Sequence, residues 1–318
     1  MGPCIRVEQM SKQYGKHLAV DSISFTVSPG EIFGFLGPNG AGKTTTQRVL
    51  TGLIKPSHGS VRILDHDMAK DPMGAKEHIG IVPETANPYT ELSAWKNMVL
   101  SGEFYGMRGK SLKSRAEEML TGFGLWERRS ESVKNYSKGM KQRLVLAMAL
   151  VHGPQILFMD EPTSGLDVES RRLIHEKVRN LTAQGVAVFY TTHHIEEANE
   201  LCARVAIIRQ GRIMAMDSPE ALKTAFQGSQ SVLAAFDRPV DEKQFSSFRS
   251  VNRVEKQADK IRLYTFTPGR AVLELAEFAK QNSLELLSVN TLGPSLEDVF
   301  VSLAHGASET SEIKDQDK

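Results

Sequence analysis

Gly37-Pro38-Asn39-Gly40-Ala41-Gly42-Lys43-Thr44 is the stretch of sequence that decides the fold. It matches the pattern GxxxxGK[ST], which forms a loop that binds phosphate groups. A nearly continuous apolar run at residues 32–36 predicts a buried strand before the loop, and residues 43–53 predict a helix after it. With average residue usage, a chain of this length would contain the pattern by chance roughly one time in a hundred. We therefore expect a strand–loop–helix unit that binds a nucleotide, and not merely a glycine-rich turn that caps a helix.

The residue types in this loop suit phosphate chemistry. Glycines let backbone N–H groups converge on phosphate oxygens, and the N-terminus of the following helix adds a favourable dipole. We expect Lys43 to reach the β- and γ-phosphates, the Thr44 hydroxyl to bind Mg²⁺, and Thr45 to complete the nucleotide contacts. The loop thus predicts a nucleoside triphosphatase, but it does not say which one.

Two carboxylates follow a second predicted buried strand, residues 156–159. They are Asp160 and Glu161, and ligands of open α/β sheets bind at the ends of strands. We expect Asp160 to hold Mg²⁺, directly or through water, and Glu161 to polarise the attacking water. On its own an Asp-Glu pair after a strand is a weak signal, because many such pairs only cap the next turn.

The segment Tyr136-Ser137-Lys138-Gly139-Met140-Lys141-Gln142-Arg143 opens a predicted long helix, and Ser137 lies 23 residues before Asp160. Ser137 is a good N-cap residue, and the free N–H groups behind it favour an anion. Alone, this segment would indicate only a capped amphipathic helix. In this order with the phosphate loop and the carboxylates, it resembles the signature motif of the ABC ATPase family. That motif contacts the γ-phosphate bound by the opposite subunit, which implies that Ser137 and Gly139 contribute to a nucleotide site.

Three further segments extend the resemblance. Ser164-Gly165-Leu166-Asp167 resembles the family's dimer-contact loop, which implies that Asp167 lies at the nucleotide interface. Thr191-Thr192-His193 resembles the switch-histidine motif, which implies that His193 touches the γ-phosphate. Tyr14 resembles the aromatic residue that stacks on adenine, although a lone tyrosine is more often ordinary packing. Six motifs in a fixed order make the resemblance specific.

The sequence also departs from the family's usual pattern within the region of resemblance, about residues 5–226. Glu84 stands where many relatives have Gln; a carboxylate can still bind Mg²⁺ through water, but its charge and donor capacity differ. The signature has Tyr136, Lys138 and Met140 where Leu, Gly and Gln are common. Together with residues 87–93 and 294–300, these variants resemble the exporter ATPases of the drug- and polysaccharide-efflux type.

Strand and helix patterns alternate along the first two thirds of the chain, which predicts a largely parallel α/β sheet. The resemblance implies that this sheet has the P-loop NTPase (ABC ATPase) fold. Early strands at residues 5–10 and 22–27 indicate an antiparallel β-subdomain, and helices after Glu84 indicate a helical subdomain. The other strands predicted here are 79–82, 186–191 and 205–208, and the other helices are 92–105, 112–123, 138–152, 170–182 and 219–226.

A Gly/Ser segment, Gly228-Ser229-Gln230-Ser231, predicts a linker before a second domain. We divide the chain into a nucleotide-binding domain, a small α+β accessory domain of ferredoxin-like type and a polar, disordered tail. Their predicted bounds are 1–227, 228–305 and 306–318. The accessory domain is predicted to contain strands 232–236, 261–266 and 284–289 and helices 271–281 and 296–304.

The bulk composition limits the function classes. With 318 residues, 40% hydrophobic and 24% charged, the chain is long enough for a large and a small globular domain. A net charge of +1 argues against nucleic acid as the main partner. The sequence shows no signal peptide and no apolar run near eighteen residues, so we expect a chain that does not cross a bilayer. Two cysteines, Cys4 and Cys202, without metal-like spacing fit a reducing cytosol.

The resemblance therefore implies an ATPase subunit of an ABC transporter that uses ATP and Mg²⁺. Two copies would face each other head to tail around two ATP molecules, closing on ATP binding and opening on hydrolysis. A separate integral membrane permease would hold the protein at the cytoplasmic face of the membrane and export its substrate. Because this chain carries every catalytic motif, a homodimer is expected, with a heterodimer as the alternative.

Two other functions stay open at this point. One is a soluble ABC ATPase that acts on ribosomes or nucleic acid, but such relatives usually carry two cassettes or a long coiled-coil insertion. The other is a non-catalytic regulatory cassette. The presence of Lys43, Asp160, Glu161 and His193 argues against it.

Overall fold

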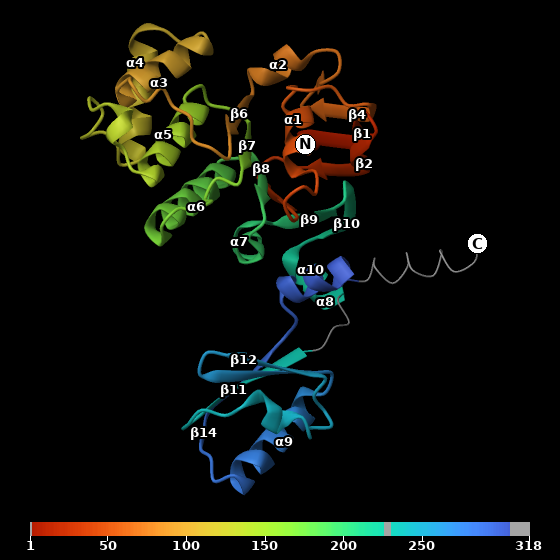
Figure 1. The fold of residues 1–318 in the computed structure, drawn as a ribbon. Helices are drawn as coiled ribbons and strands as arrows, with labels where there is room; N and C mark the ends of the chain where they lie inside the picture. Colours follow the sequence, from red (N-terminus) through yellow and green to blue (C-terminus); the bar gives the residue numbers. More distant parts are fainter. Residues whose placement is uncertain (1, 226–229, 306–318) are drawn as a thin grey trace. The chain divides into compact units, whose positions relative to one another are not determined.

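A six-stranded sheet carries the ends of the strands that the sequence motifs follow. The computed structural model describes residues 2–225 and 230–305, and the chain forms two compact units, Met1–Pro219 and Glu220–Lys318. In the first unit the strand order is β10-β9-β3-β8-β7-β6, with all neighbours parallel except β10 (Figure 1). The strands are β3 (Ile32–Leu36), β6 (Ile79–Val82), β7 (Ile156–Asp160), β8 (Ala187–Thr192), β9 (Arg204–Arg209) and β10 (Arg212–Asp217).

The central strands β3, β7 and β8 are buried along their whole length. Their apolar runs are therefore covered on both faces, as the sequence predicted for a parallel sheet. The predicted bounds of these strands agree with the structure to within one residue at each end, which is the usual uncertainty of a strand boundary. Edge strand β10 was not predicted.

An antiparallel sheet of order β2-β1-β4-β5 confirms the predicted β-subdomain. Its strands are β1 (Ile5–Tyr14), β2 (His17–Val27), β4 (His58–Ile63) and β5 (His66–Asp67). Strands β1 and β2 are longer than predicted, because register shifts along the pair interrupt the alternation of apolar and polar residues. This sheet shares a core with the six-stranded sheet, in which Phe25 stacks on Phe33 with ring centroids 5.2 Å apart.

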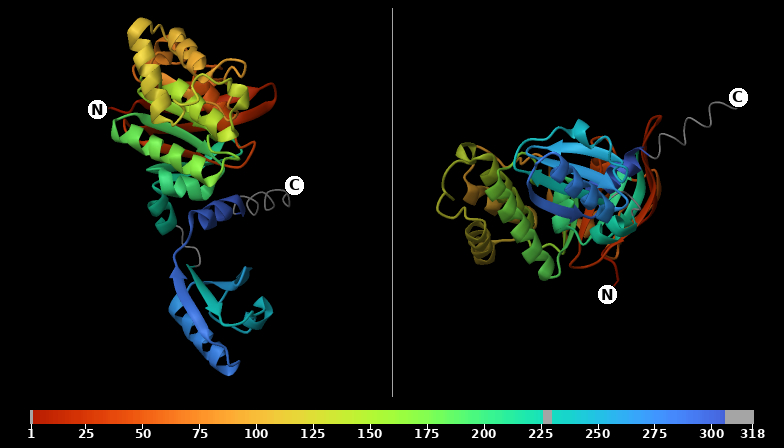
Figure 2. Two further views of the ribbon diagram at one scale, coloured as in Figure 1. Left: turned by 90° about the vertical axis from the view of Figure 1, so that its left-hand side faces the viewer. Right: turned by 90° about the horizontal axis from the view of Figure 1, so that it is seen from below.

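Three helices form the helical subdomain beside β6: α3 (Ala94–Phe104), α4 (Gly109–Gly122) and α5 (Lys138–Leu150). Figure 1 shows this group on one side of the six-stranded sheet and the antiparallel sheet on the other, and Figure 2 gives two further views. The remaining helices of the first unit are α1 (Lys43–Leu50), α2 (Pro72–Lys76), the short η1 (Val133–Asn135), α6 (Val168–Ala183) and α7 (Ile195–Leu201). The long helices were predicted to within a few residues, whereas α2 was not.

The second unit contains an antiparallel sheet of order β12-β13-β11-β14 that packs against helix α9. This is the strand order of a ferredoxin-like sheet, with a short 3₁₀ turn in place of the first helix. The elements are α8 (Pro219–Ala225), β11 (Gln230–Phe236), η2 (Glu242–Phe245), β12 (Arg253–Gln257), β13 (Lys260–Thr265), α9 (Pro268–Gln281), β14 (Leu286–Leu292) and α10 (Leu296–His305). Its core includes Val232 and Leu263 of the sheet and Leu275 of α9.

The predicted linker and tail are only partly covered by the structure. Gln230 and Ser231, predicted as linker, are the first residues of β11. The predicted domain boundary at 227/228 and the predicted disordered tail at 306–318 lie outside the described residues.

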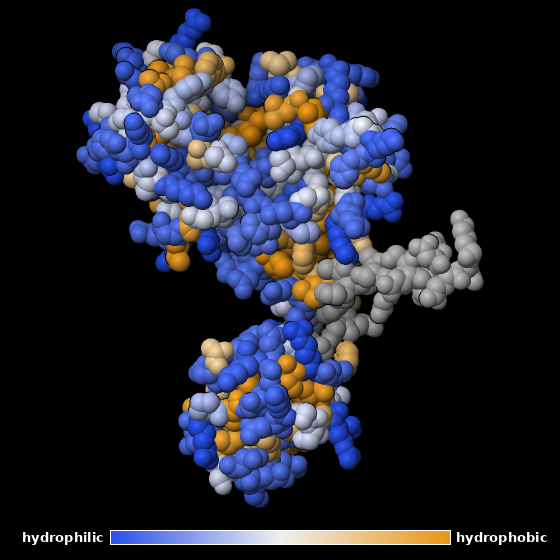
Figure 3. All heavy atoms as spheres, viewed as in Figure 1, coloured by the Kyte–Doolittle hydropathy of each residue, from blue (hydrophilic) through white to orange (hydrophobic). Residues whose placement is uncertain are grey.

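The surface fits the polar composition of the chain. On the face shown in Figure 3 hydrophilic residues predominate in both units, interrupted by hydrophobic patches. Within residues 2–225 and 230–305, no helix has the length and apolar character needed to cross a membrane.

Candidate nucleotide-binding site

The glycine-rich loop joins the end of β3 to the start of α1. Gly42 is the N-cap of α1 in a left-handed conformation with φ of 108°, and no side chain caps the helix. A Cβ atom at Gly42 would lie 2.7 Å from the carbonyl oxygen of Ala19, so only glycine fits. Because the first N–H groups of α1 have no capping side chain, they remain for an anion, and the helix dipole favours one.

A hollow of about 510 Å³ lies in front of this loop. Its volume is in the range of small-molecule sites. It is lined by Tyr14, His17, Ala19, Asn39, Gly40, Gly42, Lys43, Thr44, Thr45, Glu84 and Glu161. The structure thus brings together most of the predicted nucleotide-binding residues, and it adds His17 and Ala19. His17 pairs with Tyr14 across the β1–β2 turn. This position in the hairpin, next to a predicted site residue, was the only sequence signal that could have pointed to His17.

Lys43 is buried at the base of the hollow. Its ammonium group donates to the carbonyl oxygens of Gly37, at 2.7 Å, and Pro38, at 3.2 Å. It also forms an ion pair with Glu161, whose Oε1 lies 3.2 Å away. Gly37 and Pro38 therefore contribute backbone carbonyls that orient the lysine.

Glu161 joins Lys43 to the predicted switch histidine. Its second carboxylate oxygen, Oε2, lies 2.7 Å from His193 Nδ1. The backbone of Glu161 has φ of 45°, a conformation that non-glycine residues adopt at a cost and that is common at functional sites. The predicted cation, base and switch histidine are therefore in direct contact.

The oxygen ligands expected for Mg²⁺ come from three neighbouring segments. Asp160 ends β7, and its Oδ1 accepts a hydrogen bond of 2.5 Å from the Thr191 hydroxyl. Thr44 is exposed in the first turn of α1, and Glu84 follows β6. Hydroxyl and carboxylate oxygens are the donors that Mg²⁺ prefers, so the residues present fit this ion. Across the described part of the chain no group of three or more His, Cys, Asp or Glu side chains is arranged to hold a metal ion.

The signature segment and the dimer-contact loop lie together, but apart from this hollow. Ser137 caps α5 by accepting from the Met140 N–H, and Asp167 caps α6 by accepting from the Ser170 N–H. The Ser170 N–H and hydroxyl hold the pKa of Asp167 below its ordinary value. A Cβ atom at Gly139 would lie 2.3 Å from Ser170 Oγ, so a larger residue there would require the Ser170 side chain to move.

Ser137, Gly139 and Asp167 are therefore not brought to the phosphate loop of their own chain. Glu84 connects the two regions, because it lines the nucleotide hollow and also a second hollow of about 330 Å³ beside the signature segment. The second hollow is lined by Glu84, Thr85, Ala86, Lys138, Lys141 and Ser164.

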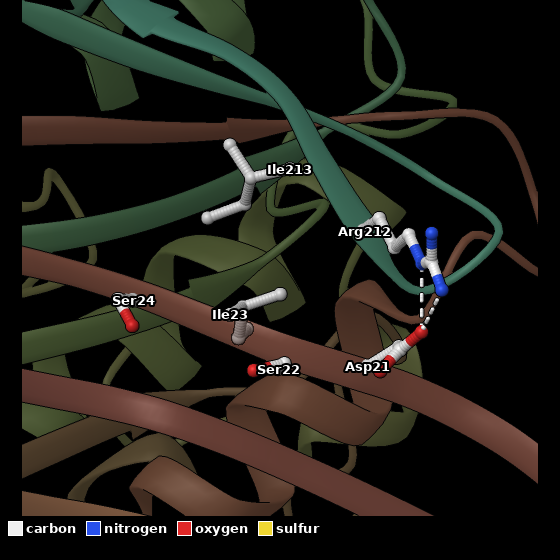
Figure 4. Close-up of a pocket in the computed structure, with 6 residues that line it drawn as sticks. All are labelled: Asp21, Ser22, Ile23, Ser24, Arg212 and Ile213. Carbon is white, nitrogen blue, oxygen red and sulfur yellow. Dashed lines mark hydrogen bonds and ion pairs between the residues drawn. The ribbon is translucent and has the colours of Figure 1, made fainter.

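The β9–β10 turn is hydrogen-bonded to the phosphate loop. The Gly211 N–H donates to the Ala41 carbonyl, and the Asp21 N–H donates to the Gly211 carbonyl. Arg212 forms an ion pair with Asp21, with Nη2 2.6 Å from Oδ2, next to a shallow hollow between β2 and β10 (Figure 4). The hydrogen bond from Gly211 holds Ala41, which lies between Gly40 and Gly42, in place.

Sequence reasoning missed a buried polar group behind the two catalytic strand ends. Glu197 of α7 contacts Thr163, His175 and Thr192, all of them buried. These residues are far apart in sequence, so no motif could reveal their contact. The one available signal was a carboxylate beside the core-facing Ala198 in the short helix α7.

Comparisons with known proteins show the family to which the chain belongs. Residues 20–164 match the family model described as ABC transporter. The chain is 35% identical over 304 residues to the linearmycin resistance ATP-binding protein of Bacillus subtilis (strain 168), covering 94% of this chain and 97% of that one. It is 33% identical over 318 residues to a daunorubicin resistance ATP-binding protein of Streptomyces coeruleorubidus, covering 99% of each. It is 38% identical over 295 residues to the Nod factor export ATP-binding protein I of Rhizobium sp. (strain N33), covering 92% and 94%.

Solved structures show the same fold. An ATP-binding subunit of an ABC transporter matches with a TM-score of 0.65 and 28% identity, over 70% of this chain and 93% of that one. A dimeric ATP-binding cassette in a post-hydrolysis state, bound to ADP and Pi, matches with a TM-score of 0.62 and 25% identity, over 67% and 98%. The chain therefore belongs to the ABC transporter family, as an ATP-binding subunit with the ABC ATPase fold whose activity is ATP hydrolysis.

Proposed function

We propose that two copies of this chain form a homodimer with two composite ATP sites and drive the export of a substrate through a separate integral membrane permease. The observation that carries the proposal is the separation of the two halves of the site. Lys43, Thr44 and Glu161 line one hollow, whereas Ser137 and Gly139 lie outside it. A second copy related by a two-fold axis would supply the missing half to each hollow. The dimeric state of a similar ATP-binding cassette supports this arrangement.

Within each hollow the chain's own residues have distinct tasks. The N–H groups of the loop and Lys43 bind the phosphates, and Tyr14 stacks on the base. Glu161 orients the attacking water and accepts its proton, while His193 holds the carboxylate and faces the γ-phosphate. Mg²⁺, held by Thr44, Asp160 and Glu84, would neutralise phosphate charge when bound.

Export is favoured by the kind of relatives that the chain resembles. These are ATP-binding proteins of linearmycin and daunorubicin resistance and of Nod factor export. We therefore place the chain at the cytoplasmic face of a membrane, attached through the permease, which selects the substrate. These relatives favour transport over the two alternatives, a soluble ATPase that acts on ribosomes or nucleic acid and a regulatory cassette.

We propose separate roles for the two structural units. We assign nucleotide binding to residues 1–227 and an accessory role to residues 228–305. The division of the chain into Met1–Pro219 and Glu220–Lys318 supports two separate domains.

Affinity purification from detergent-solubilised membranes, combined with an ATPase assay, tests the proposal. The wild-type chain should copurify with an integral membrane protein, and Lys43→Ala should abolish turnover without unfolding the chain, because the main positive charge on the phosphates is lost. Lys70→Ala is the matched control, since that lysine is 84% exposed and lies outside the hollow. Copurification with ribosomes or DNA, or turnover at the wild-type rate in folded Lys43→Ala, would contradict the proposal.

A further inference from the structure

A buried carboxylate with no contact to the nucleotide hollow lies behind the catalytic residues. Glu197 is in the first turn of α7, and only 7% of its surface is exposed. Its Oε1 accepts a hydrogen bond of 2.6 Å from the Thr163 hydroxyl and lies 2.6 Å from His175 Nε2. Its Oε2 accepts a hydrogen bond of 3.0 Å from the Thr192 hydroxyl. Both carboxylate oxygens are therefore engaged.

The partners of Glu197 connect the two strand ends that carry the catalytic groups. Thr163 follows Glu161 by two residues at the end of β7, and Thr192 directly precedes His193 at the end of β8. The Thr192 hydroxyl also accepts from the His194 N–H, at 2.9 Å, which fixes the turn after the switch histidine. Glu197 thus holds both segments through groups that water does not reach.

The charge of Glu197 is maintained despite its burial. Burial by itself raises the pKa of a carboxyl group, but hydrogen bonds from His175 and Thr163 hold the pKa of Glu197 below its ordinary value. A buried charge costs free energy that an apolar residue of similar size would avoid. The groups that donate to Glu197 lie on segments around Glu161 and His193. A role in holding these two residues in place would explain why a charge is buried here.

We propose that Glu197 is a positioning residue that fixes the distance between Glu161 and His193. The two catalytic side chains lie 2.7 Å apart, and this contact depends on the relative position of the β7 and β8 ends. Thr163 and Thr192 are the two hydroxyls through which Glu197 ties those ends together. The inference rests on the proposed roles of Glu161 and His193 in hydrolysis.

His175 extends the link to the helix that follows the dimer-contact loop. It lies on α6, eight residues after the N-cap Asp167, or roughly two helical turns. A helix transmits a displacement of one end to a side chain two turns along. The contact of His175 with Glu197 therefore links α6, the helix that follows the dimer-contact loop, to the group around the catalytic pair.

Conservative substitutions separate positioning from stability. Glu197→Gln keeps the shape of the side chain but cannot accept hydrogen bonds from all three donors. We expect kcat to fall by about 10- to 100-fold while KM for ATP changes less than about 3-fold, because the phosphate loop is untouched. Thr163→Val should lower kcat in the same way, whereas Thr163→Ser, which restores the hydroxyl, should keep it near the wild-type value. If Thr163→Ser and Thr163→Val have equal kcat, or if kcat per folded protein is unchanged in Glu197→Gln, the inference is wrong.

A double-mutant cycle shows whether Glu197 acts through the catalytic pair. In a Glu161→Gln background, Glu197→Gln should have little further effect on the residual rate, since the group that it positions is absent. Equal losses in both backgrounds would overturn the inference while leaving the role of Glu161 intact. If Glu161→Gln alone keeps the wild-type rate, the proposed role of Glu161 fails, and the inference fails with it.

Discussion

The ammonium group of Lys43 lies 3.2 Å from Glu161 Oε1, and the two side chains are only 6% and 10% exposed. The cation expected to bind the β- and γ-phosphates is thus paired with the expected catalytic base. An ion pair that is shielded from water is stronger than one at the surface. Under the proposed roles, the phosphates of ATP would compete with Glu161 for Lys43, and Glu161 would have to leave this pair before it acts on water.

Removing the charge of Glu161 should consequently strengthen ATP binding. Glu161→Gln has a similar shape, but it no longer attracts Lys43 as an ion. We expect the Kd for Mg-ATP to fall by about tenfold, which corresponds to about 1.4 kcal/mol, while hydrolysis slows by about 10² to 10⁴. Isothermal titration calorimetry and phosphate release measure the two effects. Glu117→Gln, at an exposed position of α4, is the control. An unchanged Kd in Glu161→Gln would show that the pair does not compete with ATP.

Tyr14 provides a test of base recognition. The ring is 44% exposed at the end of β1 and lines the nucleotide hollow, and Lys12 Nζ lies 5.3 Å from its centroid. Tyr14→Ala should weaken ATP binding by about 1–3 kcal/mol if the ring stacks on adenine. Tyr14→Phe keeps the ring and should bind normally. Equal affinity of Tyr14→Ala and Tyr14→Phe, measured by equilibrium titration, would assign Tyr14 to packing alone.

His152 provides a test of how the stability of the fold depends on pH. Its ring stacks on Tyr105 with centroids 3.5 Å apart, and its Nε2 donates to the Ile79 carbonyl. Burial lowers the pKa of His152 below its ordinary value of 6.5, and positive charge from Arg115 lowers it further. Below that ordinary value the unfolded chain binds a proton that the folded chain resists, so stability is complete above it and decreases as the pH falls.

His152→Gln keeps an N–H donor but does not titrate. The melting temperature of this variant should therefore fall less than that of the wild type as the pH is lowered from above to below the ordinary pKa of 6.5, where the loss of stability begins. Differential scanning fluorimetry across that range measures the difference. Parallel curves for the two proteins would show that His152 carries no such linkage.

The central sheet and the phosphate site could be predicted because their signals are local. Strands such as β3 and β7 are buried on both faces and appear as continuous apolar runs; the loop that carries Lys43 follows β3, and Asp160 ends β7. The edge strand β10 escaped prediction because its residues are largely exposed and mixed in polarity. The bulged course of β1 hid its full length for a related reason, since each bulge shifts the apolar residues to the other face.

The contacts around Glu197 could not be predicted because they are non-local. Thr163 and His175 lie 34 and 22 residues before Glu197, on different elements. Both α6 and α7 pack against β8, and this packing helps to bring them together. The pairing of Lys43 with Glu161 was equally hidden, because both residues were assigned to the nucleotide and not to each other.

The composite-site proposal makes a prediction about assembly. In Glu161→Gln, ATP binding should survive because Lys43 and the proposed ligands Thr44 and Asp160 are unchanged, whereas hydrolysis should be slow. The closed dimer should then persist, since hydrolysis no longer opens it and negative charge beside the γ-phosphate is reduced. Light scattering should show an ATP-dependent dimer for Glu161→Gln and mostly monomer for the wild type.

Ser137→Arg, introduced into Glu161→Gln, tests which surface forms this dimer. Ser137 is the N-cap of α5, so an arginine there would place a bulky side chain where the proposed dimer brings the signature to the opposite nucleotide. The double variant should stay monomeric in saturating Mg-ATP while it still binds ATP, because its own phosphate loop is intact. Ser137→Thr keeps the capping hydroxyl, and the Glu161→Gln, Ser137→Thr protein should still dimerise. A dimer that persists with Ser137→Arg would mean that the two copies meet through another surface, and a Glu161→Gln protein that stays monomeric would count against the composite site itself.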